Sequence, residues 1–305
     1  MKKCAVIGSI NMDMVVRTPR FPVGGESLIG YSFQTVPGGK GANQAIALGR
    51  LGADVRMAGT VGNDSFGKQY IEHFHKNGVD CSAVAVKDGV STGIADIVVD
   101  DSGENFIVVV PGANGECDEA WLESALEKIA DCEIVLMQLE IPLATVEKCI
   151  ERLHAAGKKI ILDPAPAAPL SRVMLEQVDY ITPNETELRI ITSDLPEEAG
   201  VEERIRRLIG ESSRMVIHKH GAEGAYIADK DGIEHVPGYK VKAVDTTAAG
   251  DTFNAGFAAG LAMGWSIRES VKLANAAGAM AVTKLGAQEG MPTLKQAQAL
   301  MNAQE

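Results

Sequence analysis

The feature that most restricts the fold is a repeated alternation between short apolar runs and longer segments with apolar residues at helical spacing. The apolar runs occupy residues 2–8, 55–60, 134–139, 159–163 and 215–218. The segments with helical spacing occupy residues 42–51, 66–77, 121–130, 143–156 and 202–209. Such runs are typical of strands buried on both faces, and strands that alternate with helices form parallel sheets. The sequence therefore predicts an α/β fold with a three-layer, Rossmann-like, mostly parallel sheet.

Two stretches interrupt this alternation and predict a second, smaller sheet. Residues 12–34 lack a convincing helix, and residues 92–110 alternate like a hairpin that turns at residues 100–103. Strands joined in this way cannot enter a parallel core without a crossover helix. We therefore expect lid strands within about residues 12–35 and 92–112, beside the strand ends where the ligand crevices of α/β folds open.

Apolar side chains on both faces of the predicted hairpin indicate a surface for a second subunit. They are Ile94, Ile97, Val98, Phe106 and Val108. Exposed apolar faces often mark an interface, and twofold dimers are the commonest assemblies of identical chains. We therefore expect a homodimer that forms through the lid sheet.

The remaining sequence gives no reason to divide the 305 residues into separate domains. Residues 248–264 and 266–283 are rich in small residues and predict two long, tightly packed helices. A content of 46% hydrophobic and 23% charged residues is typical of a globular protein, and no linker or low-complexity tract interrupts the chain. We expect a single domain over residues 1–305.

Charge and cysteine content argue against several classes of partner. A formal net charge of −12, spread over many segments, offers no basic face to a nucleic acid. No apolar stretch approaches the roughly 20 residues of a membrane span, so we expect a cytoplasmic protein without a membrane partner. Five cysteines without a CxxC pair and six histidines without an HExxH motif indicate reduced thiols and no transition-metal site.

The strongest local signal for chemistry is the segment from Asp245 to Gly256, where polar and small residues lead directly into an apolar helix. Small residues let a ligand approach the backbone, and the amides of a first helical turn can hold negative charge on a phosphoryl group. A carboxylate is unfavourable beside an anion, so Asp251 makes sense as a base for an attacking hydroxyl. With an ordinary pKa of about 4 it would accept the proton late. The alternative is that Asp251 caps the helix.

Two further segments carry weaker signals. Residues 38–43 form a glycine-rich helix start, but Gly41 after Lys40 rules out a Walker A loop. This segment is either a simple turn or a substrate loop, and the lack of GxGxxG argues against a dinucleotide dehydrogenase. Asn184 and Glu187 are three residues apart on a predicted helix, where they either face one hard cation or form an ordinary helix cap.

Taken together and in this order, these segments resemble the ribokinase-type carbohydrate kinases, also called the phosphofructokinase B family. Residues 8–13 resemble the sugar-binding opening of that family, and residues 38–43 and 245–251 resemble its two fingerprints. The resemblance extends over essentially the whole chain. It implies an ATP-dependent sugar kinase, a transferase that uses an alcohol group as acceptor.

The implied reaction is transfer of the ATP γ-phosphoryl group to the 5-hydroxyl of D-ribose, giving D-ribose 5-phosphate and ADP. Residues 38–44, 137–140 and 285–288 are most similar to members of the family that act on ribose. Related kinases for fructose, 2-deoxyribose or a nucleoside are alternatives, because a few pocket side chains can change the substrate. A non-catalytic sugar-binding protein of the same fold is a further alternative, which the presence of Asp251, Asn184 and Glu187 opposes.

Carried over residue by residue, the resemblance implies three groups of site residues. Asp251 is implied to be the base, beside an anion hole formed by Ala248, Ala249 and Gly250. The sugar is implied to lie against Asn11, Met12, Asp13, Gly39, Lys40, Gly41, Ala42, Asn43, Glu140 and Asp251. ATP is implied to lie against Asn184, Lys219, His220, Gly221, Ala222, Glu223, Gly224, Gly250 and Asn275.

The resemblance also implies two cations. Mg²⁺ is implied to bridge the ATP phosphates near Asn184 and Glu187. A monovalent cation, usually K⁺, is implied to order the anion hole from beside it. The implied K⁺ ligands are Asp245, Thr247, Ala281, Lys284, Gly286 and Gly290, mostly through main-chain carbonyls.

Two positions depart from the family pattern. The nucleotide loop reads His218-Lys219-His220-Gly221, where ribokinase-type sequences usually have a Thr-Leu-Gly type of sequence. Lys219 then either contacts a phosphate or points to solvent. Gly290 replaces a common serine, which removes one side-chain oxygen from the implied K⁺ shell.

Overall fold

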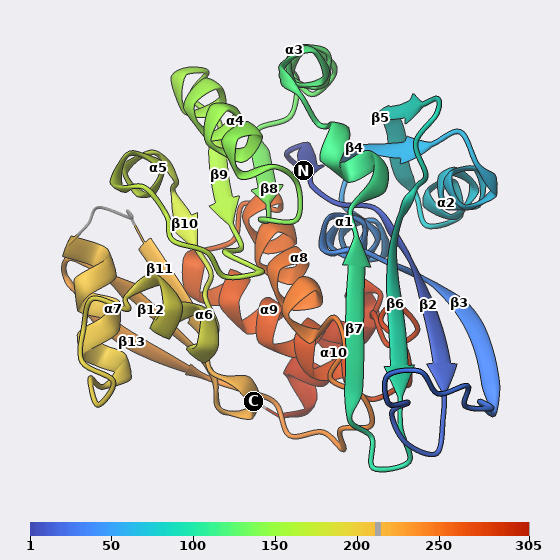
Figure 1. Cartoon of the computed structure of the whole chain (residues 1–305). Helices are drawn as coiled ribbons and strands as arrows, with labels where there is room; N and C mark the ends of the chain where they lie inside the picture. The colour runs from blue at the N-terminus through green and yellow to red at the C-terminus, as the bar shows by residue number, and fades with distance from the viewer. Residues whose placement is uncertain (211–214, 305) are drawn as a thin grey trace.

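The computed structural model describes residues 1–210 and 215–304, and a nine-stranded sheet forms its centre (Figure 1). The strand order is β13-β12-β11-β10-β9-β8-β1-β4-β5. These strands span Cys4–Ile7 (β1), Val55–Gly62 (β4), Val79–Lys87 (β5), Ile134–Met137 (β8), Lys159–Leu162 (β9), Tyr180–Ile181 (β10), Met215–Lys219 (β11), Gly224–Asp229 (β12) and Gly232–Pro237 (β13). The strands from β11 to β5 run parallel, and β12 and β13 add an antiparallel edge.

Helices cover both faces of this sheet. They span Lys40–Arg50 (α1), Ser65–Lys76 (α2), Glu119–Lys128 (α3), Leu143–Ala155 (α4), Arg172–Gln177 (α5), Glu185–Ile191 (α6), Val201–Gly210 (α7), Ala249–Ala262 (α8), Ile267–Ala281 (α9) and Leu294–Ala303 (α10). Two short 3-10 helices span Gly112–Glu116 (η1) and Gly221–Glu223 (η2). The two long helices predicted near the C-terminus are therefore confirmed as α8 and α9.

The sheet separates two apolar cores, because successive residues of a strand point to opposite faces. In β1, Cys4 and Val6 pack into one core together with α1, α2, α8, α9 and α10. Ala5 and Ile7 pack into the other core together with α3 to α7. All four residues of β1 are buried, as expected for a strand with helices over both faces. This arrangement confirms the predicted three-layer α/β fold.

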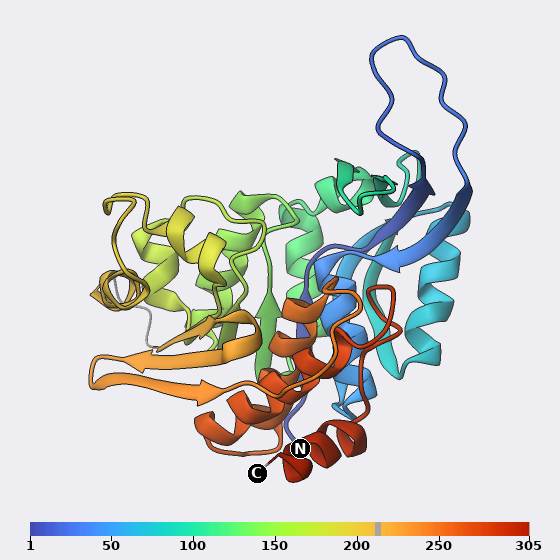
Figure 2. The same ribbon diagram turned by 90° about the horizontal axis from the view of Figure 1, so that it is seen from below.

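A second sheet of four strands projects beside the main sheet (Figure 1). Its order is β3-β2-β6-β7, with strands at Asn11–Arg17 (β2), Ser32–Gly38 (β3), Gly93–Val99 (β6) and Asn105–Val110 (β7). The loop of residues 18–31, between β2 and β3, extends away from the body (Figure 2). The predicted hairpin is confirmed as β6 and β7, and a bond from the Asp100 amide to the Glu104 carbonyl closes its turn (3.0 Å).

The sequence pattern does not predict β5, β10, β12 or β13. β10 has only two residues, and β5 and β13 are the edge strands of the sheet. An edge strand has fewer neighbours, so its burial is mixed and it lacks the continuous apolar run of a central strand. Short length or edge position therefore explains the omission of β5, β10 and β13, whereas β12 is a six-residue strand inside the sheet that neither reason covers.

The helices and the cysteines of the described residues pack into the interior of the protein. No helix among residues 1–210 and 215–304 is long and apolar enough to cross a membrane. All five cysteines are buried and free. Burial raises the pKa of the Cys4 and Cys149 thiols to about 12, so these side chains act as apolar packing groups.

The direction in which strands are added reverses at β1. β4 and β5 lie on one side of β1, whereas β8, β9 and β10 lie on the other. Open α/β sheets bind ligands beyond the carboxyl ends of the strands at such a reversal. Ser9 and Asn11 follow β1, and Glu140 follows β8. The fold therefore gathers these candidate residues at the expected crevice.

Candidate active site

The start of α8 has an unusual backbone. The helix begins at Ala249, and the preceding residue, Ala248, has a positive φ of 57°. Among the described residues no side chain caps this end of the helix. A left-handed alanine is unfavourable, and such conformations cluster at functional sites. The helix start thus lacks the usual polar side chain in front of its first amides, and the Ala249 amide donates to the Thr246 carbonyl (3.2 Å).

Asp251 lies in the first turn of α8, and its carboxylate is buried. One oxygen accepts a bond from Asn43 Nδ2 (3.0 Å) and the other accepts a bond from Gln44 Nε2 (3.1 Å). The helix cap is Ala248, so the alternative that Asp251 caps the helix is wrong. Burial raises the pKa of Asp251 to about 6, and Asp163 adds to this effect while Lys40 opposes it.

A second group of polar residues lies beside Asp251. The Glu140 carboxylate accepts bonds from Ser9 Oγ (2.6 Å) and from the Lys40 amide (3.0 Å). Burial, together with the negative charges of Glu140 and Asp251, raises the pKa of Asp13 to about 7. Lys40 is partly buried, and desolvation alone would lower the pKa of its ammonium, yet this pKa is raised because Asp251, Asp163 and Glu140 surround it.

The other implied sugar residues divide into polar and packing positions. Asn11 Oδ1 accepts a bond from Asn114 Nδ2 (2.7 Å) at the start of β2. Met12 and Ala42 belong to the apolar core beneath the site. Their contribution to the crevice is therefore shape rather than hydrogen bonding.

The glycines of residues 38–43 are required by close packing. Gly39 has a φ of 87°, and a Cβ atom there would lie 2.7 Å from the Asn11 amide nitrogen. A Cβ on Gly41 would lie 2.6 Å from the carbonyl carbon of Gly8. These contacts bring the start of α1 against the end of β1. The glycine-rich segment therefore places Lys40 and Asn43 at the same crevice as Asp251.

Lys219 does not point to solvent, and that alternative is wrong. Its side chain is only 11% exposed, and its ammonium lies 2.7 Å from Asp163 Oδ1 and 3.6 Å from Glu187 Oε2. A Cβ on Gly250 would lie 3.6 Å from the same ammonium. The ion pair therefore stands directly beside the start of α8.

Asn184 and Glu187 form a capping box at the start of α6. The Asn184 side chain accepts a bond from the Glu187 amide, and the Glu187 carboxylate accepts bonds from the Asn184 amide and Nδ2. The ordinary helix cap that the sequence left open as an alternative is therefore present. Glu187 is also buried and close to Lys219.

The residues from His220 to Gly224 form a tight turn between β11 and β12. Gly224 has a φ of 104°, and a Cβ there would lie 2.2 Å from the Val236 carbonyl. Asn275, on α9, donates to the carbonyls of Val236 and Pro237 (both 3.1 Å). The structure thus joins the implied nucleotide loop to α9 through the end of β13.

Most residues of the implied K⁺ shell lie on two adjoining loops. Asp245 accepts bonds from the Thr247 amide (2.9 Å) and hydroxyl (2.6 Å), and from the Gly286 amide (2.9 Å). Although burial opposes them, these bonds lower the pKa of Asp245. A Cβ on Gly290 would lie only 2.0 Å from the Ala281 carbonyl oxygen, so glycine fits where a serine would not. The Lys284 side chain is exposed.

The structure adds several buried polar residues that the sequence reasoning did not select. Gln44 bonds to both Asp251 and Asp163, and it accepts a bond from Gln138 Nε2 (2.6 Å). Gln288 donates to Asn43 Oδ1 (2.9 Å). Gln44 directly follows the glycine-rich segment, and Asp163 directly follows a buried strand. A polar residue at either position is a signal that could have been used.

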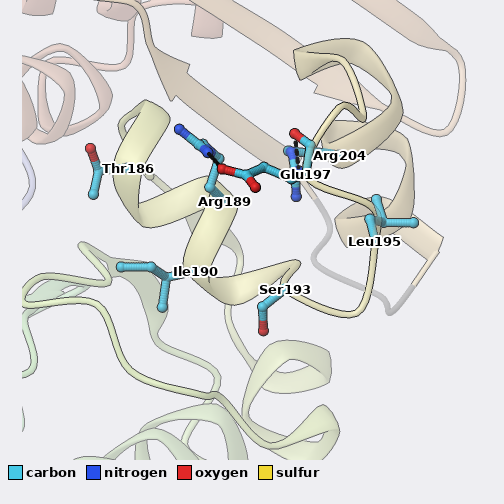
Figure 3. Close-up of a pocket in the computed structure, with 7 residues that line it drawn as sticks. All are labelled: Thr186, Arg189, Ile190, Ser193, Leu195, Glu197 and Arg204. Atoms are coloured by element: carbon cyan, nitrogen blue, oxygen red, sulfur yellow. Dashed lines mark hydrogen bonds and ion pairs between the residues drawn. The ribbon is translucent and has the colours of Figure 1, made fainter.

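A separate cavity of about 440 Å³ lies between α6 and α7 (Figure 3). It is lined by Thr186, Arg189, Ile190, Ser193, Leu195, Glu197 and Arg204. Arg189 pairs with Glu197 (3.1 Å), and the guanidinium of Arg204 donates to main-chain carbonyls, including those of Thr192 and Pro196. The charged groups of this cavity are thus engaged with the protein itself, and none of the residues around Asp251 lines it.

The structure combines a buried carboxylate, a polar cluster and a helix start with a three-layer α/β sheet and a projecting second sheet, as the resemblance to carbohydrate kinases implies. The chain belongs to the pfkB family of carbohydrate kinases, whose model matches residues 1–294. It is therefore an ATP-dependent kinase that acts on a carbohydrate.

Individual relatives agree with this family. Ribokinase from Bacillus subtilis (strain 168) is 41% identical over 303 residues, covering 99% of this chain and 100% of that protein. The crystal structure of ribokinase from Thermotoga maritima matches with a TM-score of 0.93 at 35% identity, covering 99% of this chain and 100% of the other. The structure of Arabidopsis thaliana ribokinase complexed with ribose and ATP matches with a TM-score of 0.90 at 31% identity, covering 98% of both chains.

Proposed function

We propose that this chain transfers the γ-phosphoryl group of ATP to the 5-hydroxyl of D-ribose, giving D-ribose 5-phosphate and ADP. The observation that carries the proposal is the buried Asp251 carboxylate at the start of α8, held by Asn43 and Gln44. The relative from B. subtilis supports ribose as the sugar. The Arabidopsis ribokinase, which was solved with ribose and ATP, supports both substrates.

The sugar is proposed to lie among Asn11, Asp13, Lys40, Asn43 and Glu140. Carboxylates accept bonds from hydroxyls, and amide groups both accept and donate, so this set can hold adjacent hydroxyls of one ring. The partly buried Lys40 balances the negative charge of the carboxylates around it. A rigid cluster of this kind aligns the reacting hydroxyl, which lowers the entropy cost of reaction.

Asp251 is proposed to accept the proton of the 5-hydroxyl. Its pKa of about 6 is higher than the ordinary value expected from sequence, and burial is the main cause. At neutral pH the group is still mostly ionised, and it accepts a proton more readily than an exposed aspartate does. An alcohol is far less acidic, so the proton moves as the new bond to phosphorus forms.

The first-turn amides at Ala248, Ala249 and Gly250 are proposed to stabilise the charge on the migrating phosphoryl group. Fixed amides aimed at a developing charge need no reorganisation during the reaction. ATP is proposed to reach this point from the turn of residues 220–224 and from Asn275, with Lys219 and Asn184 beside its phosphates. Asn184 and Lys219 lie at the carboxyl ends of β10 and β11.

Mg²⁺ is proposed to arrive with ATP and to keep phosphate oxygens and water as its ligands. The Glu187 carboxylate is already bonded to Asn184 and close to Lys219, so direct coordination by this residue does not fit the structure. Bound to the phosphates, Mg²⁺ would neutralise charge in the transition state. Asn184 and Glu187 are then outer contacts of its water shell.

K⁺ is proposed to bind beside the start of α8. Asp245 and the carbonyls of the adjoining loops form an all-oxygen set, which suits a hard cation. Asp245 already links the turn at Thr247 to Gly286, so a cation here would further fix the anion hole. Gly290 contributes no side-chain oxygen.

A substrate screen tests the proposed reaction. ADP release is measured with D-ribose, 2-deoxyribose, fructose and nucleosides at equal concentrations. We expect the highest kcat/KM with D-ribose, because sites that hydrogen-bond a hydroxyl discriminate strongly against its absence. Phosphorylation of a nucleoside without phosphorylation of ribose would overturn the substrate assignment, and ribose binding without ADP release would indicate a non-catalytic protein.

We also propose a single-domain, cytoplasmic homodimer. All six residues of β7 are exposed, including Phe106 and Val108, whereas Ile94, Ile97 and Val98 of β6 are partly buried. An apolar strand that lies open on one chain favours a second copy as its cover. The cytoplasmic location follows from the proposed use of ATP and a free sugar.

A further inference from the structure

Lys219 and Asp163 form a buried ion pair beside the proposed active site. Their side chains are 11% and 3% exposed, and the ammonium lies 2.7 Å from Asp163 Oδ1. Lys219 ends β11 and Asp163 follows β9, so the pair spans the carboxyl end of β10. Burying two charges carries a desolvation penalty that their attraction often fails to recover. The pair therefore calls for an explanation other than stability.

Gln44 connects this ion pair to Asp251. Its Nε2 atom bonds to Asp163 Oδ2 (2.9 Å) and to Asp251 Oδ1 (3.1 Å). Its Oε1 atom accepts a bond from Gln138 Nε2 (2.6 Å), which fixes the amide so that its two hydrogens face the two carboxylates. Gln44 is completely buried, so water cannot replace these bonds. One amide group thus bridges two carboxylates, and Lys219 neutralises the outer one.

We propose that Lys219, acting through Asp163 and Gln44, positions Asp251 and sets the pH at which this base ionises. The proposal rests on the proposed function of Asp251 as the proton acceptor. It makes Lys219 and Asp163 positioning residues, in addition to any contact of Lys219 with a phosphate. It also gives a structural role to the unusual His218-Lys219-His220-Gly221 sequence.

The charges around Asp251 fix the direction of the effect. The titratable groups that face it or share its surroundings are Asp13 on β2, Lys40 on α1, Tyr70 on α2, Glu140 after β8, Asp163 after β9, Glu187 on α6 and Lys219 on β11. The negative charge of Asp163 raises the pKa of Asp251, and Lys40 lowers it. Because Lys219 compensates Asp163, its removal should leave Lys40 as the one cation of this group beside the two carboxylates that Gln44 bridges. A proton would then be held by this pair at a higher pH.

A double-mutant cycle tests the proposal. The variants are Lys219→Met, Asp163→Asn and the combination of both, measured as kcat at saturating ribose and ATP between pH 5 and pH 9. The acidic limb is the part of the profile where kcat falls as the pH is lowered. We expect Lys219→Met to move this limb to a higher pH by about one unit, and Asp163→Asn to move it to a lower pH by a similar amount. In the double variant a neutral pair replaces the charged pair, so the pH of its acidic limb should be close to that of the parent protein.

Controls separate this role from simpler ones. Lys148→Met, which removes the exposed ion pair with Glu119 (2.9 Å), should leave the limb where it is. If Lys219→Met raises only the KM for ATP, or lowers kcat equally at every pH, the proposal is wrong and Lys219 is a nucleotide contact or a structural residue.

The test remains decisive even if the Lys219→Met variant fails to fold. Lys219→Met leaves a buried charge unpaired and can prevent folding. Asp163→Asn removes a charge instead, and an unmoved limb in that variant alone would overturn the proposal. Retention of normal turnover by Asp251→Asn would sink the proposed base itself, which is a different failure.

Discussion

The crevice at β1 and β8 and the projecting hairpin of β6 and β7 contrast sharply in what they bury. The crevice buries Asp163 and Asp251 and partly buries Asp13 and Lys40, although desolvation raises the pKa of both Asp13 and Asp251. The hairpin does the opposite, because Phe106 and its β7 neighbours are exposed apolar side chains. Each region departs from the usual rule that apolar groups lie inside and charges lie outside.

This difference shows where function, rather than folding, explains why charged side chains lie in the crevice and apolar side chains lie exposed on β7. Buried charges and exposed apolar strands both lower the stability of an isolated chain, so neither is expected unless a ligand or a partner uses it. In the crevice the charges are held by an organised network of amides. On β7, Phe21 contacts the Phe106 ring (centroids 6.3 Å apart), yet all six residues of the strand stay exposed. The charges of the first region are therefore matched within one chain, whereas the apolar side chains of the second lie open to solvent.

Removal of the base should have the largest effect. We expect Asp251→Asn to reduce turnover by at least about a hundredfold, because a positioned general base contributes this much or more. The fold should persist, since loss of a buried charge offsets the amide donor that then faces Asn43 or Gln44. Steady-state kinetics and thermal unfolding at pH 8 measure both quantities. Near-normal turnover would show that the buried charge of the crevice is not catalytic.

Asp64 is a control carboxylate outside the crevice. It caps α2 and accepts bonds from Gly67 and Thr92. These bonds lower its pKa, in contrast to Asp251, although burial opposes them. Asp64→Ala should lose about 1–2 kcal/mol of stability, as typical for a helix cap, and keep most of its turnover. A large loss of turnover without a loss of stability would contradict this division of roles.

Turnover should depend on pH through the same carboxylate. Because the pKa of Asp251 is raised to about 6, the base becomes protonated as the pH falls below that value. We expect kcat/KM for ribose to fall about tenfold for each further pH unit, as for a single essential base of the free enzyme. Profiles of kcat/KM against pH check this. A limb near pH 4 would mean that burial does not raise the pKa in the working enzyme.

Stability should change with pH in the opposite sense. Asp13 and Asp251 have folded-state pKa values of about 7 and about 6, above their ordinary values. A raised carboxyl pKa favours the folded state at low pH, and this contribution is lost as the pH rises through 6 to 7. The difference in melting temperature between pH 5 and pH 8 should therefore shrink when both residues are changed to Asn. An unchanged difference would show that these carboxyls are not strained by burial.

Charges on the hairpin should have the smallest effect on chemistry. Phe106→Asp with Val108→Asp places charges on the exposed strand, so a dimer formed there should dissociate while the free energy of unfolding changes by only about 0.5 kcal/mol. Light scattering after size-exclusion chromatography measures the mass. Ser102→Asp, in the turn of the same hairpin, is the control and should not change it. A parent protein that is already monomeric would remove the explanation for the exposed strand.

The sequence predicted the central strands of the fold and the candidate base Asp251, but not the contacts that surround this residue. Residues 55–60 and 134–139 are continuous apolar runs, and such runs identify central strands because both of their faces are covered. β10 and β13 were not predicted, because a two-residue strand and an edge strand lack a continuous apolar run in the sequence. Asp251 stood out because an acid at a helix start beside small residues is chemically unusual.

Lys219 shows where local reasoning fails. Its neighbours in the sequence allowed a phosphate contact or a solvent-exposed side chain. The structure excludes the second and shows an ion pair with Asp163, which is 56 residues away in the chain and which neither alternative included. Gln44 was passed over for the same reason, since its two carboxylate partners are distant in sequence.

The sequence by itself determined the alternation of the central strands with helices, the glycine positions that allow α1 to approach β1, and the carboxylate at the start of α8. These depend on periodicity and on the backbone freedom of single residues, which are local properties. Only the tertiary structure decided which charges meet, how deeply they are buried and therefore how far the pKa of Asp251 is raised. The reason is physical: desolvation and Coulomb interaction depend on distances in space, and the fold sets these distances between segments that the chain keeps far apart.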